Sequence, residues 1–339
     1  MYDDRVQFAV DLAFQYALFV AQGVTIWLLV VLGFAWVLRL SRKNRGRRGA
    51  HLEVVSLNER FERQALSLAK ACLSKSDYKN RKRRFKELKS ELKKRPRTFV
   101  LDFKGDLKAS GAQRLAAEVS GILNLADPQD EVLVKIESPG GAVAGYGLAA
   151  SQLKRLRDKG LKLTAAVDQV AASGGYLMAS VADHILAAPF AVVGSIGVVA
   201  SLPNFKRLLD AKQIDFEQVT AGEHKRSLSL FGENTEKGRA KVQEEVDAAH
   251  QLFKDWVLQG RPQIKLEQVA TGEWWHAGAA LELGLVDELG TSDEYLRRQA
   301  ATRQLLALQL IQPKAAGKGF SRWASLGAAL FKENETPNW

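Results

Sequence analysis

Two glycine-containing turns carry the residues of this 339-residue sequence that could do chemistry. In "ESPGGAVAGYG", Gly140 follows an apolar run, and in "AASGGYLMAS", Ser173 stands directly before Gly174. Both stretches predict a strand that bends into a helix, which leaves bare backbone N–H groups at the start of the helix. Such groups stabilise negative charge on an oxygen, as acyl transfer requires. The pattern therefore predicts Ser173 as a nucleophile, with an oxyanion hole formed by the backbone at Gly140 and Gly174.

A purely structural interpretation competes with this one. Ser173 could cap a helix, and Gly140 and Gly141 could simply form a turn. Either motif alone favours that alternative. Their joint occurrence, in order and each in a strand–turn–helix setting, favours the catalytic interpretation.

A serine nucleophile needs a base, and the residues alone leave its identity open. The histidines are His51, His184, His224, His250 and His276. None has a local context typical of a catalytic base, although a triad is defined in space rather than by spacing. A lysine is the other option, provided that apolar surroundings keep its amine neutral. The stretch "VTAGEHKRSLSLFGENT" offers Lys225 for that role.

The elements that must position these residues alternate between strands and helices. We expect strands over residues 98–103, 131–138, 161–168, 184–189 and 194–201. Helices are expected over residues 109–126, capped by Ser110, from the "PGG" turn to about residue 159, over residues 233–258, and in a short segment ending at Gly284. Strands separated by helices predict an α/β domain with a largely parallel sheet.

The N-terminal region contains a predicted membrane span. No charged residue lies between Asp11 and Arg39, and residues 17–38 are apolar for longer than the roughly 20 residues that cross a bilayer. Acidic residues precede this run and basic ones follow it, which is typical of an anchor rather than a cleaved leader. The apolar run at residues 187–202 is interrupted by Pro189, two glycines and two serines, so it predicts strands instead of a second span.

The net charge of +11 is concentrated in two segments. Residues 39–48 carry six basic and no acidic side chains, and residues 75–97 carry twelve basic and three acidic ones, so the rest of the chain is slightly acidic. Basic residues beside a span favour a cytoplasmic location for the following domain and attraction to anionic lipid headgroups. Nucleic acid is not the expected partner. The single cysteine, Cys72, excludes an intramolecular disulfide.

Changes in composition divide the chain into four predicted parts. Residues 1–50 form an anchor with a basic flank, and residues 51–96 form a basic helical arm. The catalytic domain covers residues 97–310, and residues 311–339 form a loose polar tail.

Six motifs occur in order behind the predicted span: "VLDFKGDLKAS", "ESPGGAVAGYG", "ASGGYLMAS", "GSIGVV", "TAGEHKRSL" and "GEWWHAGAALELGLVDELG". Together they resemble the signal peptide peptidase A family, and within it the SohB-type inner-membrane peptidases. The resemblance covers residues 98–305 and the anchored N-terminal extension. It implies a ClpP/crotonase-like fold of repeated ββα units and a membrane-bound serine endopeptidase that uses a Ser–Lys dyad.

The resemblance also assigns roles to individual residues. It implies Ser173 as the nucleophile and Lys225 as the general base, with Gly140 and Gly174 in the oxyanion hole. Ser195 matches a serine that hydrogen-bonds the lysine and orients it. Neither a cofactor nor a metal is implied.

The expected substrates are hydrophobic, membrane-associated peptides such as remnants of signal peptides, and the expected assembly is a homo-oligomer. The resemblance favours a periplasmic catalytic domain, whereas the basic flank favours a cytoplasmic one, so the side of the membrane stays open. Two other functions also stay open: an acyl-CoA enzyme of the crotonase type, and a non-catalytic membrane scaffold.

Overall fold

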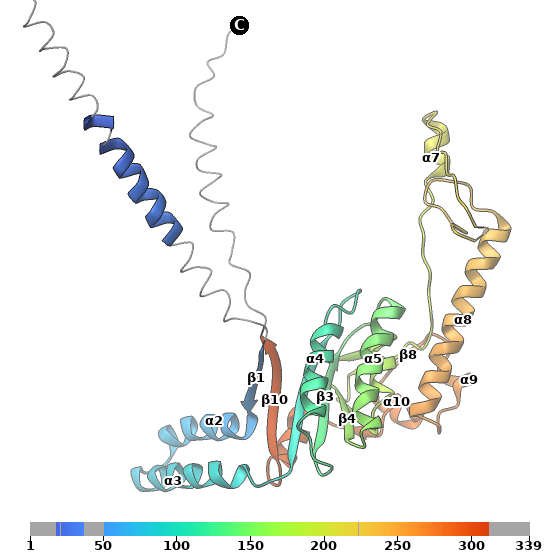
Figure 1. Cartoon of the computed structure of the whole chain (residues 1–339). Coiled ribbons are helices and arrows are strands. Elements are labelled where there is room, and N and C mark those ends of the chain that lie inside the picture. Colours follow the sequence, from blue (N-terminus) through green and yellow to red (C-terminus); the bar gives the residue numbers. More distant parts are fainter. Residues whose placement is uncertain (1–17, 21, 37–50, 223, 312–339) are drawn as a thin grey trace, which may run out of the picture. The chain divides into compact units, whose positions relative to one another are not determined.

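The structure is a computed structural model that describes residues 18–20, 22–36, 51–222 and 224–311 (Figure 1). The chain divides into two compact units. One consists of Met1–His51 and Ile311–Trp339, and the other is Leu52–Leu310. The predicted C-terminal tail and the basic flank at residues 39–48 lie outside the described residues. The four predicted domain boundaries stay predictions.

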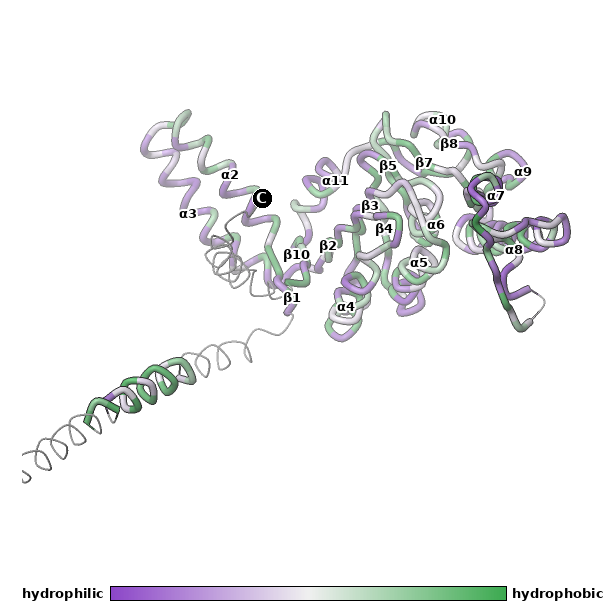
Figure 2. The backbone as a smooth tube through the Cα atoms, turned by 90° about the horizontal axis from the view of Figure 1, so that it is seen from above, coloured by the Kyte–Doolittle hydropathy of each residue, from purple (hydrophilic) through white to green (hydrophobic). Residues whose placement is uncertain are grey.

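In the first unit, the residues described around Leu18–Trp36 form a helix of 19 residues with a mean hydropathy of 2.2. Its side chains are exposed, and Figure 2 shows it as predominantly hydrophobic. It is the one helix among the described residues that is long and apolar enough to cross a bilayer. This matches the core of the span predicted at residues 17–38, whose two ends lie outside the described part.

The second unit contains a seven-stranded sheet in the order β1-β10-β2-β3-β4-β6-β9. The strands are β1 (His51–Ser56), β2 (Arg97–Lys104), β3 (Glu131–Glu137), β4 (Lys162–Val167), β6 (His184–Ala187), β9 (Glu288–Leu289) and β10 (Gln304–Ile311). The pairs from β10 through β9 are all parallel. The prediction of a mixed α/β domain with a parallel sheet is therefore confirmed.

The sheet is covered on both faces, which explains why its central strands are apolar along most of their length. In β2, Phe99, Leu101 and Phe103 belong to a large core, whereas Val100 points into a smaller one. The large core is completed by helices such as α4 (Ala112–Leu123) and α5 (Val143–Asp158). Residues from α2 (Leu57–Cys72) and α11 (Ser292–Gln299) complete the smaller core.

The sequence predicted only some of the remaining helices. The structure contains α2 (Leu57–Cys72), α3 (Lys75–Leu92), α6 (Gly174–Ala179), α7 (Lys206–Ala211), α8 (Glu236–Gly260), α9 (Leu266–Val269), α10 (Ala277–Glu282) and α11 (Ser292–Gln299). The long polar helix expected at residues 233–258 is α8, and the short helix expected before Gly284 is α10. The helical region expected after residue 51 contains α2 and α3, but it begins with the strand β1.

Two local predictions are wrong. Ser110 does not cap α4; its hydroxyl donates to the Asp106 carboxylate instead, and Gly111 occupies the cap position. The strand expected at residues 194–201 is β7 (Val192–Gly194), which ends where Gly194 and Ser195 adopt φ values of 101° and 53°. The strand β10 was not predicted at all.

A second, three-stranded sheet carries the site. It consists of β5 (Val170–Ala172), β7 and β8 (Trp274–His276), in the order β5-β7-β8. The β5–β7 pair is parallel, with Ala172 opposite Gly194, and the β7–β8 pair is antiparallel.

Candidate active site

Ser173 lies in a sharp turn between β5 and α6. Its φ of 51° and ψ of −119° are unfavourable for a residue with a side chain. The turn is fixed because the Ser173 N–H donates to the Gly194 carbonyl at 2.8 Å, and the Ser173 carbonyl accepts from the Leu177 N–H at 2.9 Å. Although Ser173 occupies the helix-cap position, its side chain makes no capping hydrogen bond. The geometry resembles a nucleophile elbow, in which a strained turn presents a serine hydroxyl.

The turn that contains Gly140 lies directly against Ser173. A Cβ atom built on Gly140 would be 2.6 Å from the Ser173 Cβ and 3.0 Å from the Gly174 nitrogen. Gly140 has a φ of 96°, which a residue with a side chain adopts only at a cost. The structure therefore brings together Gly140, Ser173 and Gly174, which are 34 positions or fewer apart in sequence but belong to different strand–turn–helix units.

The backbone N–H groups at this junction are not equivalent. The Gly140 N–H donates to the Ser138 hydroxyl at 3.1 Å, so it already has a partner. Within the described part of the chain, the N–H groups of Gly141 and Gly174 have none. The turn can thus offer the Gly141 N–H, a donor that the sequence did not single out, beside the N–H of Gly174.

Ser195 lies beside the nucleophile because β5 and β7 are paired in parallel. Each of the two serines directly follows a paired residue, Ala172 in β5 and Gly194 in β7. Ser195 also has a positive φ of 53°, and its N–H donates to the Glu273 carbonyl at 2.6 Å. The sequence-based expectation that Ser195 belongs to the same site is compatible with this placement.

Lys225 lies in a different region. The segment of residues 202–235, called the arm below, folds on itself: the Asn204 amide donates to the carbonyls of Ser229 and Gly232, and the Phe205 N–H donates to the Leu230 carbonyl. Figure 1 shows that the arm, with α7, extends beyond the ends of α4 and α5. No contact described for this domain joins Lys225 to Ser173, so one copy of the chain does not bring the predicted dyad together.

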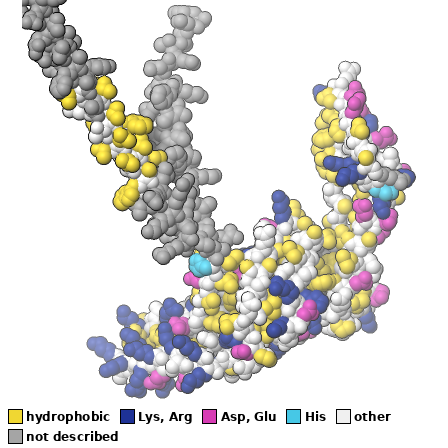
Figure 3. Space-filling view, in the orientation of Figure 1, with side chains coloured by type: hydrophobic (Ala, Val, Ile, Leu, Met, Phe, Trp, Pro, Cys, Tyr) yellow, Lys and Arg dark blue, Asp and Glu magenta, His cyan; other side chains and the backbone are white. Residues whose placement is uncertain are grey.

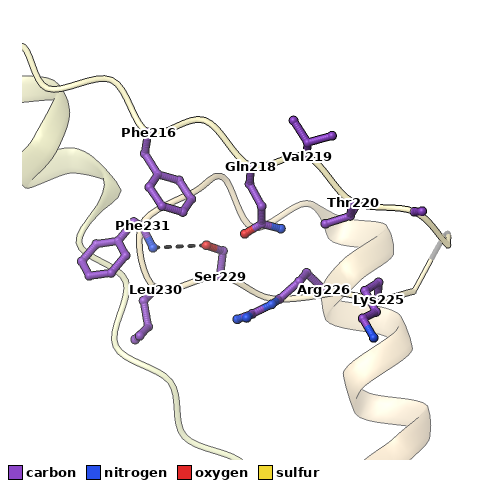
Figure 4. A pocket seen from close by; sticks show the side chains of 10 residues that line it. Phe216, Gln218, Val219, Thr220, Lys225, Arg226, Ser229, Leu230 and Phe231 are labelled. Carbon is purple, nitrogen blue, oxygen red and sulfur yellow. Dashed lines mark hydrogen bonds between the residues drawn. The ribbon is translucent and has the colours of Figure 1, made fainter.

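The arm forms an open hollow of about 650 Å³, lined by both apolar and polar residues, and Lys225 is one of them. Figure 4 shows Phe216, Leu230 and Phe231 at one end and Lys225 beside Arg226 at the other. The rings of Phe216 and Phe231 lie 5.6 Å apart. Lys225 therefore lies at the end of the hollow away from these apolar side chains, and its own side chain is exposed.

Two of the histidines that the sequence left open are engaged elsewhere. His184 contacts the Glu288 carboxylate at 3.0 Å, and His276 contacts the Phe190 carbonyl at 3.2 Å. The imidazole of His250, in the middle of α8, has a buried Nε2 atom without a hydrogen-bond partner in the described structure. None of these three has a described contact with Ser173.

Comparison with known proteins identifies two matching family models. Peptidase family S49 matches residues 155–306, and Peptidase family S49 N-terminal matches residues 11–153. The two matches meet between the Gly140 turn and the Ser173 turn, so each contributes one half of the site described above.

Several relatives are similar over much of the chain. The probable protease SohB of Haemophilus influenzae is 43% identical over 94% of each protein. The probable protease SohB of Buchnera aphidicola subsp. Schlechtendalia chinensis is 41% identical over 84% of this chain and 99% of its own length. The putative protease slr0021 of Synechocystis is 35% identical over half of this chain. The resemblance noted in the sequence is confirmed, and the chain belongs to peptidase family S49, a family of serine proteases.

Proposed function

We propose that the chain is an endopeptidase in which Ser173 is the nucleophile and Lys225 the general base. The observation that carries the proposal is the strained conformation of Ser173 beside two unpaired backbone N–H groups, because this arrangement exposes a hydroxyl next to donors for an oxyanion. The fold supports it further: β3 with α5 and β5 with α6 repeat one strand–turn–helix unit, as a ClpP/crotonase-like fold would.

In the proposed reaction, a neutral Lys225 amine takes the proton of the Ser173 hydroxyl while Oγ attacks the peptide carbonyl carbon. The negative charge that moves to the carbonyl oxygen is stabilised by the N–H of Gly174 and by the Gly140–Gly141 turn. Collapse of the tetrahedral intermediate breaks the C–N bond, and the lysine returns its proton to the leaving amine. Water, activated by the same lysine, then hydrolyses the acyl ester and restores Ser173.

Lys225 would reach Ser173 of a second copy of the chain. The arm extends from the layered domain, by which we mean the two sheets and the helices that cover them. The surface of the arm is rich in exposed apolar side chains, including Val219 (98% exposed), Leu208 and Ile214. Docking of the arm onto a neighbour would bury these side chains and remove the lysine from water, and loss of water favours the neutral amine that the reaction needs. The proposed assembly is therefore a homo-oligomer with shared sites.

We assign hydrophobic, membrane-associated peptides as the substrate class. The chain carries a helix apolar enough to span a bilayer, which would hold the domain near such peptides, and the hollow in the arm has an apolar end formed by Phe216, Leu230 and Phe231. Protease digestion of the domain in oriented vesicles would assign the side of the membrane on which it works.

The second membrane contact that we propose is a basic face on α3. Lys75, Lys79, Lys82 and Lys86 recur at helical spacing, are exposed, and have no ion-pair partner in the described structure. Figure 3 shows Lys and Arg side chains gathered over α2 and α3. Anionic lipid headgroups fit this face, because the apolar helix in the same chain would keep a bilayer within reach.

Three variants of the full chain in detergent test the dyad. Ser173→Ala and Lys225→Arg should each lower cleavage of an apolar fluorogenic peptide by at least 10³-fold, because the former lacks the nucleophile and the latter cannot lose its proton. Mixing Ser173→Ala with Lys225→Ala subunits should restore about a quarter of the activity, since random assembly gives that share of sites with both residues intact. Wild-type activity of Ser173→Ala would disprove the nucleophile, and failure of mixed oligomers to recover would disprove the shared site.

A further inference from the structure

A chain of buried hydroxyl groups lies behind the Gly140 turn. Ser138 and Tyr146 are fully buried, and their side-chain oxygens are 2.6 Å apart. The Ser138 hydroxyl accepts a hydrogen bond from the Gly140 N–H at 3.1 Å, and the Tyr146 hydroxyl donates to the Asp106 carbonyl at 2.9 Å. The four groups form a continuous path from the turn to the loop that follows β2.

The direction of each hydrogen bond in this path follows from the number of protons. A carbonyl oxygen can only accept, so the single proton of the Tyr146 hydroxyl points to Asp106. The Ser138 hydroxyl must therefore donate to the Tyr146 oxygen, and its own oxygen is left to accept from the Gly140 N–H. Burial raises the pKa of Tyr146, so the hydroxyl keeps its proton at neutral pH. Every group in the path is thus satisfied in one arrangement only, which fixes the orientation of the Gly140 N–H.

Tyr146 also touches the other half of the site. A Cβ atom built on Gly174 would collide with the Tyr146 ring, which shows that the ring lies directly behind the residue that follows Ser173. The opposite side of the path is closed as well, because a Cβ on Gly105 would collide with both the Ser138 and Tyr146 hydroxyls. The tyrosine therefore contacts the Gly174 turn through its ring and holds the Gly140 turn through Ser138.

We propose that Tyr146 and Ser138 are positioning residues for the oxyanion hole: they hold the Gly140–Gly141 turn against Ser173 so that the Gly141 and Gly174 N–H groups face one oxygen. This inference rests on the peptidase function proposed above. Engagement of the Gly140 N–H by Ser138 leaves Gly141 as the donor of that turn. The pair touches neither substrate nor the reacting atoms, so it acts only through the geometry of the backbone.

The test uses the full chain in detergent and compares Tyr146→Phe, Ser138→Ala and the double variant. Each single variant should lower kcat roughly tenfold with KM changed less than twofold, because the donors bind the transition state rather than the substrate. The affinity for a peptide aldehyde, which forms a tetrahedral adduct with the serine, should fall in the same proportion as kcat. The double variant should be no worse than the poorer single variant, since both changes break the same path.

Tyr176→Phe is the matched control. Its hydroxyl is also buried and also donates to a backbone carbonyl, that of Leu285 at 2.9 Å, and none of the hydrogen bonds described for it reaches the Gly140 turn. This variant should lose a comparable amount of thermal stability and keep the wild-type kcat. An equal loss of kcat in Tyr176→Phe would attribute the effect to loosening of the core and overturn the proposal.

The outcomes separate this proposal from the peptidase function. Wild-type kcat in Tyr146→Phe, together with an inactive Ser173→Ala, would overturn the positioning role and leave the peptidase intact. An active Ser173→Ala would overturn both. If Tyr146→Phe does not fold, Ser138→Ala tests the positioning role in its place, because it removes one atom from the same path. A rise in KM with unchanged kcat in Ser138→Ala would also overturn the proposal.

Discussion

At the scale of single residues, Gly140 has no room for a side chain. Gly140→Ala should lower peptidase activity at least 100-fold, because its methyl group would press on Ser173 and on the Gly174 nitrogen. The measurement is kcat/KM on an apolar peptide. The matched control is Gly160→Ala: Gly160 has a similar φ of 84°, but nothing lies within 4 Å of the added methyl. Gly160→Ala should lose about 1 kcal/mol of stability and keep its activity. Equal inactivation of both variants would show that backbone strain alone explains the loss of activity in Gly140→Ala.

Asp287 lies at the surface and makes an ion pair with a buried arginine, and the contribution of this pair to stability depends on pH. Its carboxylate accepts from the Arg261 guanidinium at 2.7 Å and from the Ile185 N–H at 2.7 Å, and Arg261 is only 3% exposed. Burial acts to raise the pKa of Asp287, but the hydrogen bonds from Arg261 and Ile185 outweigh it and hold the pKa below its usual range. A depressed carboxyl pKa stabilises the fold above the unfolded pKa of about 3.9, and this stabilisation is lost as the pH falls through the folded pKa.

Asp287→Asn should therefore lower the free energy of unfolding by roughly 1–3 kcal/mol at pH 7, because the buried Arg261 guanidinium loses its charged partner and keeps only the Gly284 carbonyl. The difference from the wild type should begin to shrink as the pH falls below the unfolded pKa of about 3.9, and it should be lost below the lower folded pKa, where the wild-type carboxyl is protonated too. Urea unfolding over a range of pH values measures both effects. Asp293→Asn, at the exposed start of α11, is the control and should show neither the loss of stability nor its dependence on pH. A stability difference between wild type and Asp287→Asn that stays constant with pH would contradict the ion-pair explanation.

At the scale of secondary-structure elements, two helical glycines have opposite surroundings. Gly147 in α5 has nothing within 4 Å of an added Cβ, whereas a Cβ on Gly238 in α8 would collide with the Ser227 carbonyl of the arm. Alanine is favoured over glycine within a helix by up to about 1 kcal/mol. Gly147→Ala should thus stabilise the protein by up to that amount, and Gly238→Ala should displace the segment that carries Lys225.

Thermal unfolding and peptidase activity measure the two effects. Gly147→Ala should have a raised melting temperature and wild-type activity. Gly238→Ala should lose activity at least tenfold while its melting temperature changes little, because the arm and not the layered domain is disturbed. Full activity in Gly238→Ala would show that α8 does not fix the position of Lys225.

The elements differ in how far the sequence could predict them. The strands β2, β3, β4 and β6 were predicted because they are short apolar runs bounded by polar turns, a signal that is local. The strand β10 escaped prediction because its pairing with β2 joins residues about 200 positions apart, and β7 was misplaced because the positive φ values at Gly194 and Ser195 end it early.

The site follows the same division. The Gly140 and Ser173 turns were predicted because each motif is contiguous in sequence. The hydroxyl path was not, although Ser138 lies within the "ESPGG" motif and Tyr146 belongs to the apolar face of α5 that also includes Ala149 and Leu153. From the sequence alone, a tyrosine on the apolar face of a helix looks like an ordinary core residue. Only the fold shows that the Tyr146 hydroxyl reaches Ser138. The separation of Lys225 from Ser173 in one copy was equally hidden, since it depends on the conformation of the arm.

At the scale of the whole molecule, the basic face of α3 predicts a lipid-dependent position of the α2–α3 pair. The single cysteine, Cys72, is exposed at the end of α2 and can report it. In nanodiscs, labelling of Cys72 by a water-soluble maleimide should be severalfold slower with phosphatidylglycerol than with phosphatidylcholine alone, because docking of α3 would shield it. High salt should remove the difference.

Replacing Lys79, Lys82 and Lys86 by Gln should also abolish the difference between the two lipids. Replacing Lys159 and Lys162, exposed lysines that follow α5, should leave it unchanged. Protection of Cys72 by RNA but not by anionic lipid would identify the basic face as a nucleic-acid surface instead.

The strained turn at Ser173 has a consequence for how such a protein evolves. Glycine would adopt its φ of 51° without penalty, so replacing the serine by glycine would relieve strain worth on the order of 1–3 kcal/mol. Selection for stability alone would favour this substitution, which would remove the nucleophile and abolish the activity. A serine kept at this strained position therefore indicates selection for catalysis, and we expect position 173 to be among the first to change in descendants that have lost the activity.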